Sequence, residues 1–119
     1  MEAYRVLGED CLELSSCKLE RLMLEGCKIN DEGAKHLAKN IEYNTSLRFL
    51  DLSRNMISES GALELAKMIA SNTTLAVLFL HWNKLQPKGG SEIAKALLKN
   101  TSIQILDISY CSMGGSRGT

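Results

Sequence analysis

Residues 47–57 of this chain read LRFLDLSRNMI, a stretch in which aliphatic residues recur at fixed positions. As a pattern it is L-x-x-L-x-L-x-x-N-x-L, with Ile57 in the closing position. The same pattern starts at Leu19, Leu75 and Ile103, so the four starts are 28 residues apart. A constant spacing of this length is the signature of a repeat array.

The first half of each unit alternates with period two, as Leu50 and Leu52 show. This alternation is typical of a short strand with one buried face. The equivalent pairs are Leu22 and Leu24, Leu78 and Leu80, and Leu106 and Ile108. The turn position that follows holds Cys27, Asn55, Asn83 and Cys111. We expect the side chains at this position to bond backbone groups of neighbouring turns, because buried turn backbone needs such partners. This explains two of the four cysteines as structural thiols.

The second half of each unit has an apolar stripe at i, i+3, i+4 and i+7, the spacing of an amphipathic helix. Its members are Ala34, Leu37, Ala38 and Ile41, then Ala62, Leu65, Ala66 and Ile69, then Gly90, Ile93, Ala94 and Leu97. Just before each stripe stand Gly33, Gly61 and Gly89, which we interpret as the tight start of a helix.

Each predicted helix ends in a triplet of the form Asn-Thr-Ser/Thr, at residues 44–46, 72–74 and 100–102. We expect the asparagine to adopt the left-handed backbone that often follows a helix. The triplet also matches the N-glycosylation pattern. Because the triplet recurs with the repeat and the chain shows no secretory signal, we do not predict glycosylation.

The 28-residue unit, the strand pattern and the helical segment Gly-Ala-x-x-Leu-Ala resemble the ribonuclease-inhibitor class of leucine-rich repeats over residues 19–113. This resemblance implies an α/β horseshoe with a parallel sheet on its concave side and helices on its convex side. It also implies protein binding without catalysis. Residues 1–18 then form an irregular N-terminal segment or a decayed repeat, and residues 114–119 a truncated tail, so the chain is expected to be a fragment of a longer array.

Composition excludes several other classes. The chain has 119 residues, which fits one domain. Its 14 basic and 14 acidic side chains give no overall field that would attract nucleic acid or an anionic membrane. No run approaches the roughly 20 apolar residues of a membrane span, and the N-terminus lacks a secretory start. The spacing of the cysteines predicts no disulfide framework or zinc site. We therefore expect a cytoplasmic protein without a cofactor or metal.

The strand residues between the buried leucines must point to the concave face. Neighbouring strands lie about 4.8 Å apart, so these residues predict one contiguous surface. Its apolar and aromatic members are Phe49, Val77, Phe79, Trp82, Ile105 and Tyr110, and the polar members at its border are Asp51, Arg54, His81 and Asp107. An apolar patch rimmed by charge is typical of a protein-binding site.

Other interpretations remain open. Phe49, Val77 and Ile105 could simply prefer strands and pack on one another, or the surface could cover missing parts of a longer chain. His81 near Asp51 suggests acid–base work or a metal, but no nucleophile accompanies it, so a solvated or hydrogen-bonded histidine is the stronger interpretation and we predict no enzyme. Rival functions are a cytoskeletal or ciliary scaffold, or regulation of an enzyme as an inhibitor or GTPase activator. The uncapped ends predict self-association.

Overall fold

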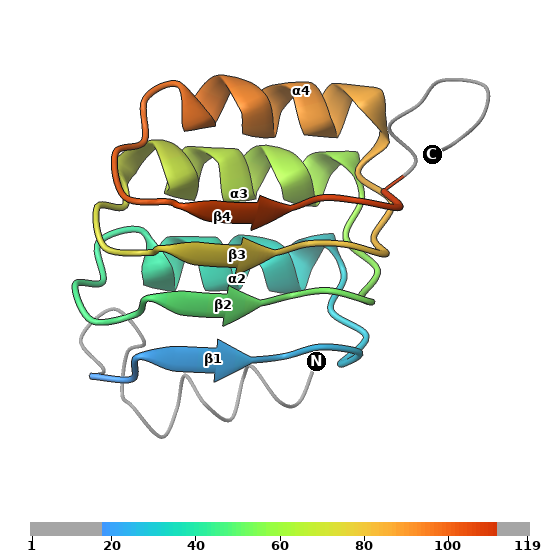
Figure 1. Cartoon of the computed structure of the whole chain (residues 1–119). Helices are drawn as coiled ribbons and strands as arrows, with labels where there is room; N and C mark the ends of the chain where they lie inside the picture. The colour runs from blue at the N-terminus through green and yellow to red at the C-terminus, as the bar shows by residue number, and fades with distance from the viewer. Residues whose placement is uncertain (1–17, 112–119) are drawn as a thin grey trace.

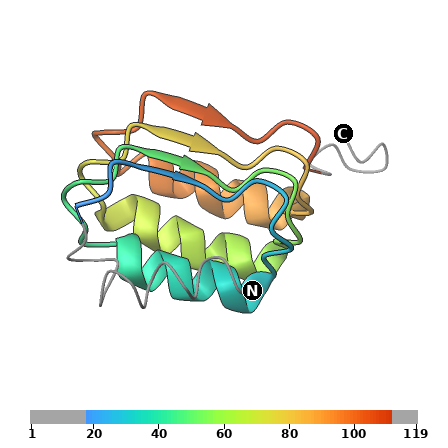
Figure 2. The same ribbon diagram turned by 90° about the horizontal axis from the view of Figure 1, so that it is seen from below.

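A computed structural model describes residues 18–111 and shows strands alternating with helices (Figure 1). In chain order the elements are β1 (Arg21–Met23), α2 (Asp31–Ile41), β2 (Phe49–Asp51), α3 (Glu59–Ser71), β3 (Val77–Phe79), α4 (Gln86–Leu97) and β4 (Ile105–Asp107). The strands form one sheet in the order β1-β2-β3-β4, and all of its pairs are parallel. The helices cover one face of the sheet only (Figure 2). The predicted α/β repeat fold is confirmed.

The strands pair without any shift in register. Phe49 lies opposite Arg21 in β1 and Val77 in β3, and Val77 in turn lies opposite Ile105 in β4. Each partner is one repeat length away in sequence. Residues at the same repeat position therefore form columns that run across the sheet, as the sequence predicts.

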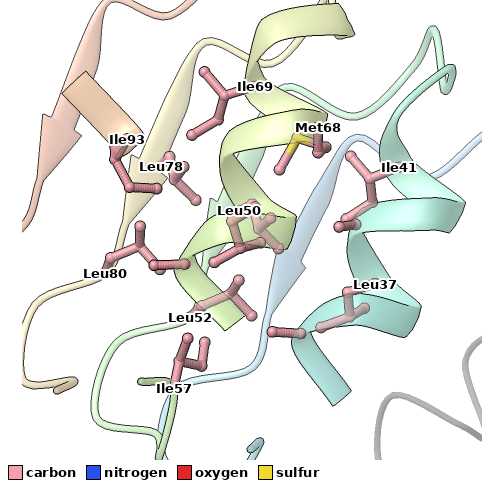
Figure 3. Close-up of a cluster of buried hydrophobic side chains, with 14 of the residues drawn as sticks. Leu37, Ile41, Leu50, Leu52, Ile57, Met68, Ile69, Leu78, Leu80 and Ile93 are labelled. Atoms are coloured by element: carbon pink, nitrogen blue, oxygen red, sulfur yellow. The ribbon is translucent and has the colours of Figure 1, made fainter. Parts of the chain in front are cut away.

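The core fills the space between the sheet and the helices (Figure 3). Leu50, Leu52, Leu78 and Leu80 from the strand layer are fully buried, as is Ile69 from α3. The alternation within the strands places one face in this core, because Leu22 is buried while its neighbours on both sides are exposed. The predicted inward leucines are thus confirmed for the three repeats that have a following neighbour.

Ala94 corrects the predicted stripe of α4, because it is exposed. Ala66 has the same repeat position in α3, and it is buried because α4 packs beside α3. Within residues 18–111, α4 is the last helix, so no further helix covers the corresponding side of Ala94. Ala96 is buried instead.

Gly61 and Gly89, near the starts of α3 and α4, have a different role from the one predicted. Among the described glycines only Gly26 has a positive φ. A Cβ atom at Gly61 would collide with the Asp31 carboxylate of the preceding helix, and one at Gly89 would come within 2.9 Å of Ala62 Cβ. These glycines therefore permit close packing of adjacent helices rather than a tight start.

The asparagines after the helices are also not left-handed, which corrects the prediction. Asn72 has φ −71° and ψ 139°, an extended conformation. Its Nδ2 donates to the carbonyl oxygens of Ile41 (2.8 Å) and Asn44 (3.2 Å), and its Oδ1 accepts from the Leu75 amide (2.7 Å). Asn100 repeats this arrangement one unit later. The triplets thus form a hydrogen-bond ladder between repeats.

A second ladder runs through the turn position after each strand, where the sequence predicts one. Asn83 Nδ2 donates to the carbonyls of Leu52 (2.9 Å) and Leu80 (3.0 Å), and its Oδ1 accepts from the Ile57 amide (3.0 Å). Asn55 has equivalent bonds. At Cys111 the thiol donates to Leu80 O at 3.0 Å, and burial raises its pKa.

The predicted N-terminal segment, apart from Lys18, and the predicted tail at 114–119 lie outside the described residues. Within the part that is described, no helix has the length and hydrophobicity needed to cross a membrane.

Candidate protein-binding surface

The face of the sheet opposite the helices, together with the turn residues at the strand ends, forms one surface, the open sheet face (Figure 2). All of the predicted binding residues belong to the strands or to the turns that follow them. Parallel pairing in register brings them into neighbouring columns. Their side-chain contacts divide most of them into two groups.

The first group surrounds two phenylalanines. The rings of Phe49 and Phe79 meet edge to face, with centroids 5.3 Å apart and planes at 79°. The guanidinium carbon of Arg21 lies 4.2 Å from the Phe49 centroid, and the His81 ring lies 5.9 Å from that of Phe79. Both phenylalanines are half-buried, so each ring covers part of the other, as expected if these strand residues pack on one another. Ile105 at the end of the first column is 52% exposed.

The second group is a stack at the strand ends. The rings of Trp82 and Tyr110 are nearly parallel, with centroids 4.5 Å apart and an interplanar angle of 9°. On the other side of the indole, the Arg54 guanidinium carbon lies 5.5 Å from the ring centroid, and Arg54 Nε lies 3.3 Å from a carboxylate oxygen of Glu25. Trp82 remains 48% exposed and Tyr110 59% exposed. This group lies outside the core.

The backbone beneath this stack is unusual. Arg54, Trp82 and Tyr110 have φ values of 56°, 61° and 58°, and Gly26 has 68° at the same repeat position. A left-handed conformation costs a non-glycine residue roughly 1–2 kcal/mol. The repeat pattern did not predict this backbone, although Gly26 at that position was a signal for it.

Asp51 is less accessible than its predicted place at the border suggests. It is 6% exposed, and its Oδ1 accepts hydrogen bonds from the Ser53 amide (2.9 Å) and hydroxyl (2.6 Å). Asp107 bonds Ser109 in the same way, at 2.9 and 2.7 Å. Its side chain nevertheless remains 41% exposed, because β4 lies at the end of the described sheet.

Asp107 and His81 face each other across β3 and β4. Hydrogen bonds from the Ser109 hydroxyl and amide lower the pKa of Asp107, with a smaller contribution from His81. His81 Nδ1 lies 3.4 Å from Asp107 Oδ2, a distance that permits an ion pair when the imidazole is protonated. The arrangement lacks hydrogen-bond geometry, however, so this buried nitrogen has no hydrogen-bond partner. No group of three or more potential metal ligands occurs within residues 18–111.

Comparison with known proteins identifies the repeat. Residues 12–38, 43–66, 71–94 and 99–116 match the family described as "Leucine Rich repeat". No curated protein matches the chain. Among solved structures, the chain is similar to "Leiomodin-1 Actin-Binding Site 2 (ABS2)", with a TM-score of 0.73 and 23% sequence identity. The match covers 89% of this chain and 60% of the leiomodin chain. A likeness at this identity shows the shared fold.

Proposed function

Since this chain belongs to the leucine-rich repeat family, we propose that it is a non-catalytic module that recognises a protein partner through its open sheet face. The stacked pair of Trp82 and Tyr110 is the observation that carries this proposal. Both rings are about half exposed at 48% and 59%, and both residues have a left-handed backbone that is costly for large side chains. Tryptophan, tyrosine and arginine are the residues that most often anchor protein interfaces.

The proposed site consists of two anchor residues and a set of contact residues around them. Trp82 and Tyr110 are the anchor, and Arg54 covers the inner face of the indole. The remaining proposed contact residues are Phe49, Asp51, Val77, Phe79, His81, Ile105 and Asp107. Of these, Ile105 is the most exposed apolar residue, at 52%. Charged groups at such a border contribute more to the association rate and specificity than to affinity.

Affinity capture from a cell lysate, with mass spectrometry, tests the proposal. The bait is compared with a Phe79→Asp, Trp82→Asp double variant. We expect at least one protein that the unaltered chain captures to be lost in the double variant. Circular dichroism must first show that the double variant remains folded.

Leu63→Asp provides a matched control, because Leu63 is 41% exposed on α3 and therefore lies on the helical side of the molecule. This variant should retain the partner. If the Leu63 variant loses the partner while the double variant retains it, the binding site lies on the helices and the proposal is wrong.

A cytoskeletal partner is the second candidate. The similar solved structure is an actin-binding site of leiomodin-1, which makes actin the first defined protein to test. Co-sedimentation with filamentous actin would support this candidate if the chain enters the pellet in proportion to actin and the double variant does not. A chain that stays in the supernatant at every actin concentration would contradict it.

The finer assignments belong to the same proposal. We propose that residues 19–113 form a cytoplasmic array of the ribonuclease-inhibitor-like class, since each 28-residue unit pairs one strand with a helix. Self-association is proposed through the end of the array, where Leu98 and Ile105 are 88% and 52% exposed. Sedimentation velocity should then show an average mass that rises with protein concentration, and a concentration-independent monomer would contradict it.

A further inference from the structure

The stack at the strand ends has a definite order and one free end. From β2 to β4 it runs Arg54, Trp82, Tyr110, and Glu25 holds the guanidinium of Arg54 at a distance of 3.3 Å. The first aromatic ring therefore already carries a cation on its inner face. Tyr110 has Trp82 on one side of its ring and is 59% exposed, and within residues 18–111 no other aromatic ring or cation stacks on it.

The charges on the open sheet face are balanced at one end and unbalanced at the other. The strand segments 19–27 and 47–55 together carry three arginines and three carboxylates. The segments 75–83 and 103–111 carry one carboxylate, Asp107, and neither lysine nor arginine. Asp107 is 41% exposed, and its nearest basic group is the imidazole of His81. Within these strand segments, the Tyr110 end therefore has one carboxylate and no lysine or arginine to pair with it.

From the exposed ring of Tyr110 and the partly exposed carboxylate of Asp107, we propose that the Tyr110 end of the open sheet face binds an arginine side chain of the protein partner. The ring face of tyrosine attracts a cation through its quadrupole. The three-residue separation of Asp107 and Tyr110 keeps their Cα atoms within about 11 Å. Within about one Debye length the Asp107 carboxylate also attracts a cation that stacks on the ring, and the planar guanidinium of arginine suits such stacking.

The chain itself contains two examples of the same recognition. Arg21 lies over Phe49 at 4.2 Å, and Arg54 lies over Trp82 at 5.5 Å while it is paired with Glu25. In both cases a guanidinium comes from the preceding repeat. A partner arginine on Tyr110 would reproduce the arrangement at the opposite end of the stack. Lysine fits less well, because its ammonium is compact and strongly hydrated and lacks a planar surface.

The test uses three acetylated, amidated tetrapeptides: tetra-arginine, tetra-lysine and tetra-citrulline. Citrulline keeps the planar shape without the charge, and lysine keeps the charge without the plane. Trp82 is the only tryptophan in the chain, so its indole N–H resonance and its fluorescence report directly on the stack. We expect tetra-arginine to shift the Trp82 signals, tetra-lysine to bind about fivefold more weakly, and tetra-citrulline to have no effect.

Two variants locate the site. Tyr110→Gly removes the ring and places glycine at the positive φ that Gly26 already adopts, so the fold should be retained. Asp107→Asn removes the charge while its amide oxygen can still accept from Ser109. Each should weaken tetra-arginine binding about fivefold. Glu20→Gln is the matched control, because it removes one exposed carboxylate next to β1, at the other end of the sheet and outside the stack, and it should leave the affinity unchanged.

Equal binding of tetra-arginine and tetra-lysine, or an equal loss in the Glu20 and Asp107 variants, would show general charge attraction and overturn the inference. The inference rests on the proposed function, and affinity capture with these variants distinguishes the failure of one from the failure of the other. A partner lost in the Phe79→Asp, Trp82→Asp variant but retained by Tyr110→Gly and Asp107→Asn would refute the arginine site alone. A partner retained by all of these variants would refute both.

Discussion

Trp82 has a backbone conformation that suits glycine better than tryptophan. Its φ of 61° costs roughly 1–2 kcal/mol. Stacking on Tyr110 returns about 0.5–1.5 kcal/mol, and the Arg54 contact about 0.5–1 kcal/mol at an exposed site. These directed contributions roughly cancel the backbone strain, so the net stabilisation by the indole comes from the half of its surface that is buried. The exposed half adds nothing to the free energy of folding, which leaves it available for recognition.

Trp82→Gly should accordingly cost less than truncation of a fully buried aromatic residue, which is about 3–5 kcal/mol. We expect the free energy of unfolding to fall by roughly 1–2 kcal/mol, because relief of the backbone strain offsets the lost stack but not the lost burial. Urea titration followed by far-ultraviolet circular dichroism measures this change. A loss above about 2 kcal/mol would mean that the ring is mainly structural, and its proposed role as a binding anchor would lose its basis.

At the scale of elements, the contact between α2 and α3 depends on the Asp31 carboxylate and on the lack of a side chain at Gly61. Asp31 of α2 accepts hydrogen bonds from the Ser58 amide (2.7 Å), the Ser58 hydroxyl and the Gly61 amide (3.1 Å) at the start of α3. Gly61 leaves room for this carboxylate. The helix N-terminus thus receives a negative charge from the preceding repeat, which is a favourable arrangement.

Gly61→Ala should destabilise the protein by about 1–3 kcal/mol, because the added methyl group would collide with the Asp31 carboxylate and with Ile57. Gly90→Ala is the matched control in the next helix. Gly90 has the repeat position that Ala34 and Ala62 fill, so alanine should be neutral there or add up to about 1 kcal/mol. The melting temperature of the Gly61 variant should fall, whereas that of the Gly90 variant should stay the same or rise. Equal destabilisation of the two would contradict the proposed close packing at Gly61.

The same carboxylate predicts a dependence on pH. Burial raises the pKa of Asp31, but hydrogen bonds from Ser58, Ser60 and Gly61 outweigh burial, and the pKa is lowered overall. A pKa that is lower in the folded state than in the unfolded chain gives stability above the unfolded value of about 3.9, and this stability is lost as the pH falls through the folded value. Asp31→Asn should therefore be less stable than the unaltered chain at pH 7, and the difference should shrink toward pH 3. Urea midpoints at both pH values measure it, and a difference that is constant with pH would contradict this role.

At the scale of the whole molecule, burial declines toward the last strand. Leu50, Leu78 and Leu80 are fully buried, whereas Leu106 and Ile108 are partly exposed because β4 ends the described sheet. Each repeat receives part of its burial and hydrogen bonding from the next one, as in a one-dimensional array.

Leu80→Ala should therefore cost about 2–5 kcal/mol, the range for truncation of a fully buried leucine. Leu106→Ala should cost clearly less, since the leucine at the edge already contacts water. Chemical denaturation of both variants gives the comparison. Equal losses would show that the end of the array is as well packed as its centre.

The period and the alternation of the sequence were enough to predict the strands and the columns of equivalent residues, and the resemblance to a known repeat class implied the parallel sheet and the ladder at Asn55 and Asn83. They could not predict properties that depend on a neighbouring repeat. Asp51 is enclosed because β3 follows its strand, whereas Asp107 has the same bonds to its serine and stays partly exposed at the end of the described sheet. Likewise, Ala94 is exposed because no helix among the described residues covers it. The ladder at Asn72 and Asn100 escaped prediction because the triplet was interpreted as a left-handed end of the helix, whereas Asn72 is extended and its side chain reaches the preceding unit.

One backbone position recurs at Gly26, Arg54, Trp82 and Tyr110, and it has nearly the same φ in every repeat. The main chain there takes one shape whether the residue has no side chain, a flexible cation or a large ring. The identity of the residue is therefore uncoupled from the architecture. Randomising this single position in every unit would produce a library of scaffolds that differ in the ligand they select and share one backbone.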